Sequence, residues 1–531
     1  MVRPPTPRRT APLATATRTT VLDEAGVERL LRPRDDVVVE APAGDGSFTA
    51  VTGAFSRYRR TVAASRRPDG RFDATVTVDF RVAVPGWGVV FVPLLRRALT
   101  RPPGARPPWW APPDRLDERA GTVLGWLLTA SLVAGYLGTL LTQTMTFAAD
   151  EFGAGEAAQG TTLAVVRVAI VPALVLVALA DRRGRRRVLV GSAAGAVVLA
   201  ACGALAPSLA VLGATQVAAR GCSIALAILI SIVAAEEMPA GSRAYAISVL
   251  AMAAALGAGV CLWALPLADT GEQGWRALYV LPLLSLPLVR KIATGLPESR
   301  RFAAPHATAP VSGHGRRFWL LGAAAFLLSL FGTPASGFLN EFLREDRGYT
   351  AAGITAFSIL TNTPGGIGIV VGGKLADLRG RRLVGAVATF VGTGATALMF
   401  LGSGWAMWAW SILGAVVGAA AVPALGVYGP ELFPTSLRGR ANGVIAGLGV
   451  AGGVLGLVLA GALADPLGGI GHAIAVLAVA PVVLAVLVLT AFPETAHREL
   501  EELNPEDRLP GGPPAPPSPA PPRSGPAPRP R

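Results

Sequence analysis

Apolar runs long enough to cross a lipid bilayer fill most of the sequence between residues 120 and 500. A transmembrane helix needs about 20 mainly apolar residues, and only helices or closed barrels satisfy their own backbone hydrogen bonds in lipid. Charged residues make up only 15% of the chain, whereas a soluble domain is about one quarter charged. We expect twelve spans, near residues 122–148, 159–180, 188–207, 209–234, 244–268, 276–293, 318–340, 351–376, 383–402, 405–428, 440–464 and 469–492.

A short basic sequence occurs twice, each time between two of these apolar runs. The copies are Asp181–Arg186, which reads Asp-Arg-Arg-Gly-Arg-Arg, and Asp377–Arg382, which reads Asp-Leu-Arg-Gly-Arg-Arg. A duplicated half explains the repetition, and internal repeats are characteristic of secondary transporters. Further pairs have nearly the same spacing, namely Glu236 with Glu431, Arg243 with Arg438, and Glu298 with Glu494.

Each copy is expected to form a tight basic turn between two membrane helices. Its glycine permits a backbone conformation that bulkier residues avoid. Its carboxylate can face the N-terminal end of a helix, where unpaired N–H groups and the helix dipole favour negative charge. Its arginines favour the cytoplasmic side of the membrane.

These loops resemble the signature of the major facilitator superfamily, G-x-x-x-D-x-x-G-R-R after the second helix of each half. The second copy matches it completely, whereas the first has Val177 in place of the leading glycine. The segments around Glu298 and Glu494 resemble the sugar-porter and metabolite–proton symporter branches. The resemblance implies two six-helix repeats that work by alternating access. It also implies a cytoplasmic gate made of Asp181, Gly184, Arg185, Arg186, Glu236, Arg243, Glu298, Gly373, Asp377, Gly380, Arg381, Arg382, Glu431, Arg438 and Glu494.

A soluble module is expected ahead of the spans. Apolar and polar residues alternate over 72–84, which predicts a half-buried strand, and residues 48–63 are a weaker strand candidate. The apolar run 87–99 is too short to span a bilayer, and predicts a helix packed on the sheet or lying at the membrane surface. Two interpretations stay open for this module: a regulatory or ligand-sensing domain, and an extension without a separate role.

The predicted fold class is an all-α polytopic membrane protein with a small N-terminal α+β cytosolic module. The expected segments are a disordered N-terminus (1–20), the module (21–104), a linker (105–119), the N-terminal half (120–293), a central cytoplasmic loop (294–317), the C-terminal half (318–500) and a disordered Pro-rich tail (501–531).

The distribution of charge predicts the orientation of the chain. Arginines concentrate in the motif loops and the central loop, so both termini are expected to be cytoplasmic, in the cell inner (plasma) membrane. The net charge of +14 does not indicate nucleic-acid binding, because the arginines lie in tails and between apolar spans.

The sequence also argues against an enzyme. The three cysteines fall inside predicted spans, which does not suggest a disulfide set. No spacing typical of metal ligands and no P-loop is present, so we expect no metal, no cofactor and no use of ATP. A lipid-modifying enzyme would need a cluster of His, Asp or Glu at a membrane face, and the sequence shows none.

Polar residues inside the spans are candidates for a substrate cavity, because polar groups in lipid are costly without a role. Most of them could instead bond neighbouring helices. No Asp or Glu lies within a predicted span core, and Glu341, at the end of its span, is the only candidate proton carrier. Arg220 lies deep without an obvious acidic partner. It is therefore expected to bind an anionic substrate, to bond backbone carbonyls where Pro364 and Gly365 interrupt their helix, or to line a water-filled cavity. The candidates are Gln143, Arg167, Gln216, Arg220, Asn340, Glu341 and Asn362.

The leading hypothesis is a secondary active transporter of a small solute, with symport or uniport and an organic anion favoured. One alternative is a drug or metabolite efflux antiporter. A second, of another class, is a membrane sensor that reads a ligand through the N-terminal module and does not transport. The expected partners are a small-molecule substrate, possible coupling ions and the lipid bilayer, and a monomer is favoured.

Overall fold

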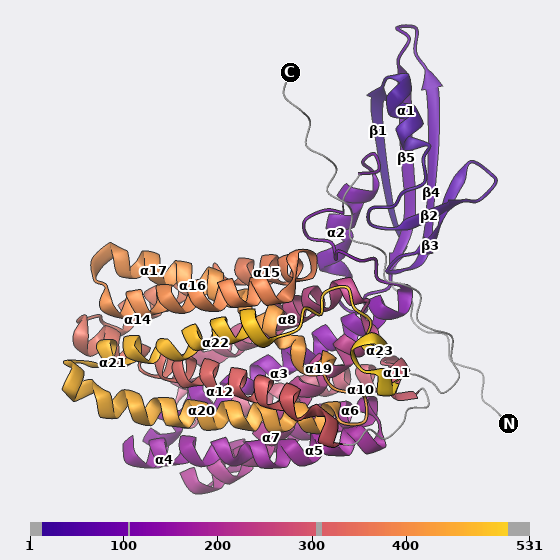
Figure 1. The fold of residues 1–531 in the computed structure, drawn as a ribbon. Coiled ribbons are helices and arrows are strands. Elements are labelled where there is room, and N and C mark those ends of the chain that lie inside the picture. The colour runs from indigo at the N-terminus through magenta and orange to yellow at the C-terminus, as the bar shows by residue number, and fades with distance from the viewer. Residues whose placement is uncertain (1–12, 105–106, 155, 304–310, 508–531) are drawn as a thin grey trace, which may run out of the picture.

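The computed structural model describes residues 13–104, 107–154, 156–303 and 311–507, which form a helical bundle with a small β-rich module at one end (Figure 1). Within these residues, twelve helical segments are long and apolar enough to cross a membrane. Their positions confirm the twelve spans expected from hydropathy, to within a few residues at most ends.

Each half of the bundle has six spans, several of which consist of two or three helices in succession. The first half contains α3 (Glu118–Glu151), α4 (Glu156–Val166) with α5 (Ile170–Arg183), α6 (Arg185–Cys202), α7 (Leu209–Glu237), α8 (Arg243–Ala264), and α9 (Trp275–Val280) with α10 (Leu286–Gly295). The second half contains α12 (Gly315–Gly337) with α13 (Leu339–Glu341), α14 (Ala351–Asn362) with α15 (Gly365–Arg379), α16 (Arg381–Leu401), α17 (Gly404–Ala419) with α18 (Ala421–Gly426) and α19 (Tyr428–Glu431), α20 (Arg438–Leu467), and α21 (Ile470–Leu477) with α22 (Val479–Ala491).

Two interruptions of the spans fall at candidate site residues. The break between α14 and α15 lies at Thr363 and Pro364, where the sequence predicts a bend because proline lacks an N–H and disrupts the helical ladder. Arg167 begins a short 3₁₀ turn between α4 and α5.

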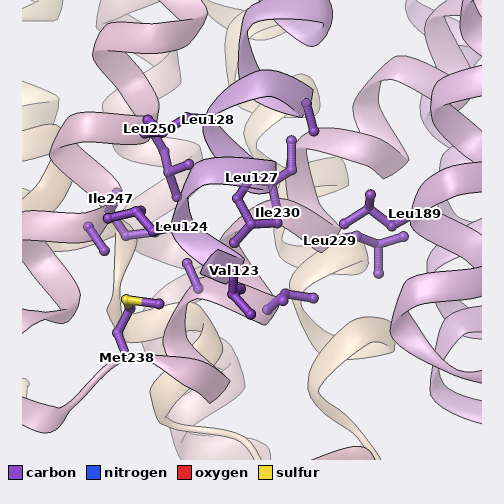
Figure 2. Packing of buried hydrophobic residues seen from close by; sticks show 14 of the residues in the cluster. Val123, Leu124, Leu127, Leu128, Leu189, Leu229, Ile230, Met238, Ile247 and Leu250 are labelled. Carbon is purple, nitrogen blue, oxygen red and sulfur yellow. The ribbon is translucent and has the colours of Figure 1, made fainter. Parts of the chain in front are cut away.

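Glycines let the long helices of the bundle approach closely. A Cβ on Gly135 of α3 would overlap the backbone of Ala254 on α8, and one on Gly257 of α8 would overlap Leu132 on α3. Close backbone approach at small residues is the usual basis of helix association in membranes. Buried Val, Leu and Ile residues from α3, α6, α7 and α8 fill the remaining space, as Figure 2 shows around Leu127 and Leu229.

The N-terminal module is a five-stranded antiparallel sheet in the order β1-β5-β4-β3-β2. The predicted alternating strand is confirmed as β5, with Ala74, Val76, Val78 and Phe80 at most 2% exposed. They pack in one core cluster with Leu95 and other residues of α2. The elements are β1 (Ala14–Leu22), α1 (Glu24–Leu30), β2 (Val39–Pro42), β3 (Ser47–Thr52), β4 (Phe55–Arg66), β5 (Phe72–Val82) and α2 (Gly88–Leu99).

The structure corrects three expectations about the soluble parts. Residues 14–20, expected to be disordered, belong to β1, whose β-branched residues pair along β5. The single strand expected over 48–63 is two strands, β3 and β4. Residues 501–507, expected to be disordered, form most of α23 (Leu500–Leu503) and a following 3₁₀ turn. Residues 1–12 and 508–531 lie outside the described part of the chain.

We predict that deleting residues 1–104 leaves the twelve spans inserted and folded, because the module has its own core and the bundle has its own. The deletion removes the contacts of Ala54 and Pro85 with Gly121 and Gly125 of α3, but no span. Fluorescence-detected size-exclusion chromatography of a fluorescent-protein fusion should give one symmetric peak. Aggregation or rapid degradation of the truncated chain would show that the module is required for the bundle to fold.

Candidate functional site

The aspartate of each repeated motif lies at the end of a helix in one half and bonds to the start of a helix in the other. The carboxylate of Asp377, on α15, accepts from the backbone N–H groups of Ala244 (3.2 Å) and Tyr245 (2.8 Å) in the first turn of α8. A negative charge at this position is favoured by the unpaired N–H groups and the dipole of the helix. The sequence suggested a helix terminus, but not one in the opposite half.

The first copy repeats this geometry at the other contact between the halves. Asp181, on α5, accepts from the backbone N–H groups of Gly439 (3.1 Å) and Arg440 (2.9 Å) in the first turn of α20. Two equivalent carboxylate contacts therefore join the halves at the same end of the bundle. We refer to this end, where the two motif turns lie, as the motif end.

Buried arginines extend the second contact into an ion-pair network. Arg381 bonds to Asp377 (3.1 Å), to Glu431 and to the carbonyl oxygen of Ala240 (3.0 Å). Arg243, from the opposite half, pairs with Glu431 (3.2 Å). Both guanidinium groups are at most 1% exposed, so each depends on these partners to offset the loss of water.

The first contact has the corresponding network. Arg185 pairs with Asp181 (2.6 Å) and Glu236 (3.5 Å). Arg438, from the opposite half, pairs with Glu236 (2.5 Å) and with Asp507 (3.4 Å) near the end of the described chain. The sequence did not indicate Asp507 as a partner, because it lies in the segment that was expected to be disordered.

The motif glycines allow a glutamate from the end of each half to reach the turn. Gly184 and Gly380 have φ of 103° and 101°, a conformation that favours glycine. A Cβ on either would lie 2.6 Å from a carboxylate oxygen, of Glu298 or Glu494 respectively. These carboxylates accept from backbone N–H groups of Arg186 (3.1 Å) in the first case, and of Arg381 (3.0 Å) and Arg382 (3.2 Å) in the second.

The first motif lacks its leading glycine, and the partner helix supplies the space instead. In the second copy, a Cβ on Gly373 of α15 would lie 2.6 Å from the Cβ of Ser248 on α8. In the first copy, fully buried Val177 stands at the corresponding position. The repeat counterpart of Ser248 is Gly443 on α20, where a Cβ would lie 2.7 Å from Leu174 of α5. In the first copy, the small residue at the contact therefore belongs to the partner helix α20, and not to the motif helix α5.

The linker from the module crosses both halves beside the Asp377 network. On the second half, the Lys374 ammonium on α15 donates to linker carbonyls. On the first half, Tyr245 donates to the carbonyl of Trp110 (2.8 Å), and Asp114 accepts from the N–H of Gly241 (2.8 Å). The linker therefore ties α15 to α8. The acceptors of Lys374 are Pro108 (2.7 Å), Trp109 (3.1 Å) and Ala111 (3.1 Å).

The central loop and the C-terminal segment also cover the motif end. Arg301, in the central loop, pairs with Glu499 (3.5 Å) and Glu501. Asp117, which caps the start of α3, pairs with Arg300 (2.8 Å). Burial alone would raise the pKa of Asp117, but Arg300 and the N–H of Ala120 outweigh it and hold that pKa below its usual value. The carboxylate therefore stays charged at neutral pH.

The structure places Arg167 and Arg220 together among the cavity candidates. Arg220 donates to the carbonyl oxygen of Gly138 on α3 (2.5 Å). Arg167 is exposed and lies close enough for its positive charge to act on Arg220. Among the described residues, neither guanidinium forms an ion pair. The carbonyl to which Arg220 donates lies on α3, and not at the Pro364 break.

The remaining candidates are not brought to one point. Gln216 is 5% exposed and packs against Gly203, where a Cβ would lie 2.6 Å from its Nε2. Asn362 is exposed and donates to the carbonyl of Ser358 in its own helix (2.9 Å). Gln143 is half-buried, and both Asn340 and Glu341 are exposed. The structure thus gathers the gate candidates far more closely than the cavity candidates.

Two sets of six spans, joined by two equivalent ion-pair networks, form a polytopic helical bundle of two repeats. The sequence profile of the Major Facilitator Superfamily matches residues 319–524. The match covers nearly all of the second six-span half, which resembles this superfamily of secondary transporters of small solutes.

Solved structures of transporters share the fold at low sequence identity. The human organic anion transporter MFSD10 is 16% identical, with a TM-score of 0.57, over 69% of this chain and 98% of that one. The proton:xylose symporter XylE is 16% identical, with a TM-score of 0.61, over 72% and 98%. The E. coli fucose:proton symporter FucP is 12% identical, with a TM-score of 0.57, over 70% and 98%. No curated protein sequence matches the chain significantly.

We predict that Asp377→Asn and Asp181→Asn each open the motif end, to a similar extent. Loss of the charge removes a helix-terminus contact worth up to about 2 kcal/mol and weakens a buried ion pair, which corresponds to more than a tenfold change in the population of the closed state. A cysteine at Ser248, which is fully buried, should react faster with an impermeant maleimide in either variant, once native Cys202, Cys222 and Cys261 are replaced.

The matched control is Asp465→Asn, which removes an exposed carboxylate at the other end of α20. The control should leave the labelling rate unchanged. An unchanged rate in both motif variants would show that these carboxylates do not hold the halves together.

We predict that Lys374→Met frees the linker. Hydrogen bonds to a charged group contribute about 1.5–3 kcal/mol each, and methionine keeps the aliphatic chain but makes none of the three bonds. Trypsin should therefore cleave the linker after Arg115, which is followed by Leu116, at least tenfold faster. Lys291→Met removes the only other lysine and should leave the rate unchanged. Equal rates in the two variants would mean that the bonds of Lys374 do not hold the linker.

Proposed function

We propose that this protein carries a small organic anion across the cell membrane by alternating access, with the motif end facing the cytoplasm. The observation that carries the gating part of the proposal is the pair of inter-half networks, which hold α5 against α20 and α8 against α15. Their bonds are discrete contacts that must break for the halves to separate. The same bonds can form again, as a transport cycle requires.

The orientation is supported by exposed positive charge at the motif end. Arg182, Arg183 and Arg187 are exposed at the first turn, and Arg379 and Arg382 are exposed at the second. Loops rich in arginine stay on the cytoplasmic side when the chain inserts. In this orientation the structure is closed toward the cytoplasm, and the module and the last described residue, Asp507, lie on that side of the plasma membrane.

The anionic substrate is supported by Arg167 and Arg220. Arginine remains charged when buried, and its planar fork suits a carboxylate or phosphate held by two hydrogen bonds. Two guanidinium groups that repel one another are stabilised by an anion placed between them. Among the fold neighbours, MFSD10 is described as an organic anion transporter, which is consistent with such a substrate on this scaffold.

Glu341 is the proposed proton carrier. Glu341 is exposed at the end of its span, and the nearby charges of Glu345 and Asp346 act on it. XylE and FucP are described as proton symporters, so symport is favoured over uniport.

We predict that purified protein in liposomes takes up organic acids saturably and that Arg220→Gln lowers this uptake more than tenfold in kcat/KM. Removing one partner of a desolvated charge contact costs about 2–5 kcal/mol. Arg290→Gln, a change of an exposed arginine near the end of its span, is the matched control. The panel should include monocarboxylic and dicarboxylic acids, phosphate esters, neutral sugars and amines.

Saturable uptake of neutral or cationic solutes alone would contradict an anionic substrate, as would normal uptake of acids by Arg220→Gln. Export driven by an inward proton gradient would favour the antiporter alternative. Specific ligand binding without any uptake would favour the sensor alternative.

A further inference from the structure

We propose that the face of the module formed by α2 and the edge strand β1 binds the head groups of anionic phospholipids in the membrane that the bundle spans. Three independent features of this face support the proposal: its position beside α3, the residues that α2 exposes, and a group of arginines that form no ion pair with the described residues.

The loop that leads into α2 packs directly on a membrane span. A Cβ on Gly125 of α3 would lie 2.6 Å from the ring of Pro85, and Trp87 Nε1 donates to Thr129 Oγ1 (3.2 Å). Both α3 residues lie inside the span that begins at Glu118. The first turn of α2 is therefore held close to the edge of the bilayer.

The orientation of the module keeps it near that surface. Figure 1 shows the strands of the sheet running across the direction of the bundle helices, with α2 close to the bundle. The module thus extends sideways from the bundle and not along its axis.

The outward side of α2 changes from apolar to basic along its length. Its inward residues Leu95 and Leu99 are buried in the module core. Near its start, Val89 is 82% exposed and Val90 is 48% exposed. Trp109 of the linker is 72% exposed, and tryptophan is enriched at the head-group level of membranes.

Four arginines surround a groove between β1 and α2. The groove has a volume of about 470 Å³ and is lined by Thr15, Ala16, Thr17, Arg18, Arg96, Arg97, Thr100 and Arg101, without a carboxylate. Among the described residues, none of its four arginines forms an ion pair. In contrast, Arg34 and Arg60 in the core of the same module are paired with Asp36 and Glu40.

The combination of features favours lipid over another acidic partner. Free guanidinium groups match phosphate oxygens well, but that match alone would also suit a nucleic acid or an acidic protein. An apolar helix end beside a transmembrane span, followed by basic residues, is the arrangement of helices that lie in a membrane interface.

The test measures the environment of α2 in the full-length protein. A cysteine at Val89, in a chain with the three native cysteines replaced, is labelled with an environment-sensitive dye. The protein is then placed in nanodiscs of phosphatidylcholine, or of phosphatidylcholine mixed with phosphatidylglycerol. In the anionic lipid, we expect the emission of the dye to be blue-shifted and the dye to be protected from a water-soluble quencher. High salt should remove this protection, because it screens the charges.

The charge variant replaces Arg18, Arg96, Arg97 and Arg101 with glutamine. Each arginine lost near an anionic surface should lower the ratio of docked to free module about fivefold. The matched control replaces four other exposed arginines, Arg29, Arg57, Arg66 and Arg71, and should leave quenching unchanged. Equal quenching in both lipids and at both salt concentrations would overturn the proposal. Equal protection in neutral detergent would do so as well, since it would show that α2 is covered by protein.

Discussion

A carboxylate from one half that accepts hydrogen bonds from the first turn of a helix in the other is the contact on which the closed bundle depends. Asp377 of α15 accepts from the first turn of α8, and Asp181 of α5 accepts from the first turn of α20. Each also pairs with a buried arginine four residues on. Without the carboxylate, that arginine would lose a partner and the helix terminus would lose its acceptor, so one carboxylate links an ion pair within its own half to a helix of the other half.

The repeat conserves this arrangement while distributing the small residues differently. Between α15 and α8 the glycine is Gly373 on the motif helix, whereas between α5 and α20 the glycine is Gly443 on the partner helix. Close approach requires one small residue at the contact, on either side. The departure of the first motif from its family pattern is therefore compatible with an equally close contact, and both contacts are expected to respond alike to loss of charge.

Hydropathy predicted the spans well, because each helix in lipid must be about 20 residues long and apolar, whatever its neighbours. The alternation of apolar and polar residues predicted β5 equally well, since one face of this strand is buried. Partners across the halves could not be predicted, because Asp377 and Ala244 are far apart in sequence and share no periodicity. Lys374 and Asp507 were missed for a related reason: their partners are backbone groups of a linker, or lie beyond the last span. The acidic residues 501–507 resembled disorder, because nothing in the sequence indicates that Asp507 reaches Arg438 and the N–H of Thr435.

The most direct test of the account is the distance between the halves at the motif end, measured by electron paramagnetic resonance. Spin labels at Arg187 and Leu383, which are exposed in the first and second half respectively, report this distance in the cysteine-replaced chain. Without substrate, the account predicts one short distance in the otherwise unaltered chain and a dominant longer one when Asp181 and Asp377 are both replaced by asparagine. The same distance distribution in both proteins would contradict it.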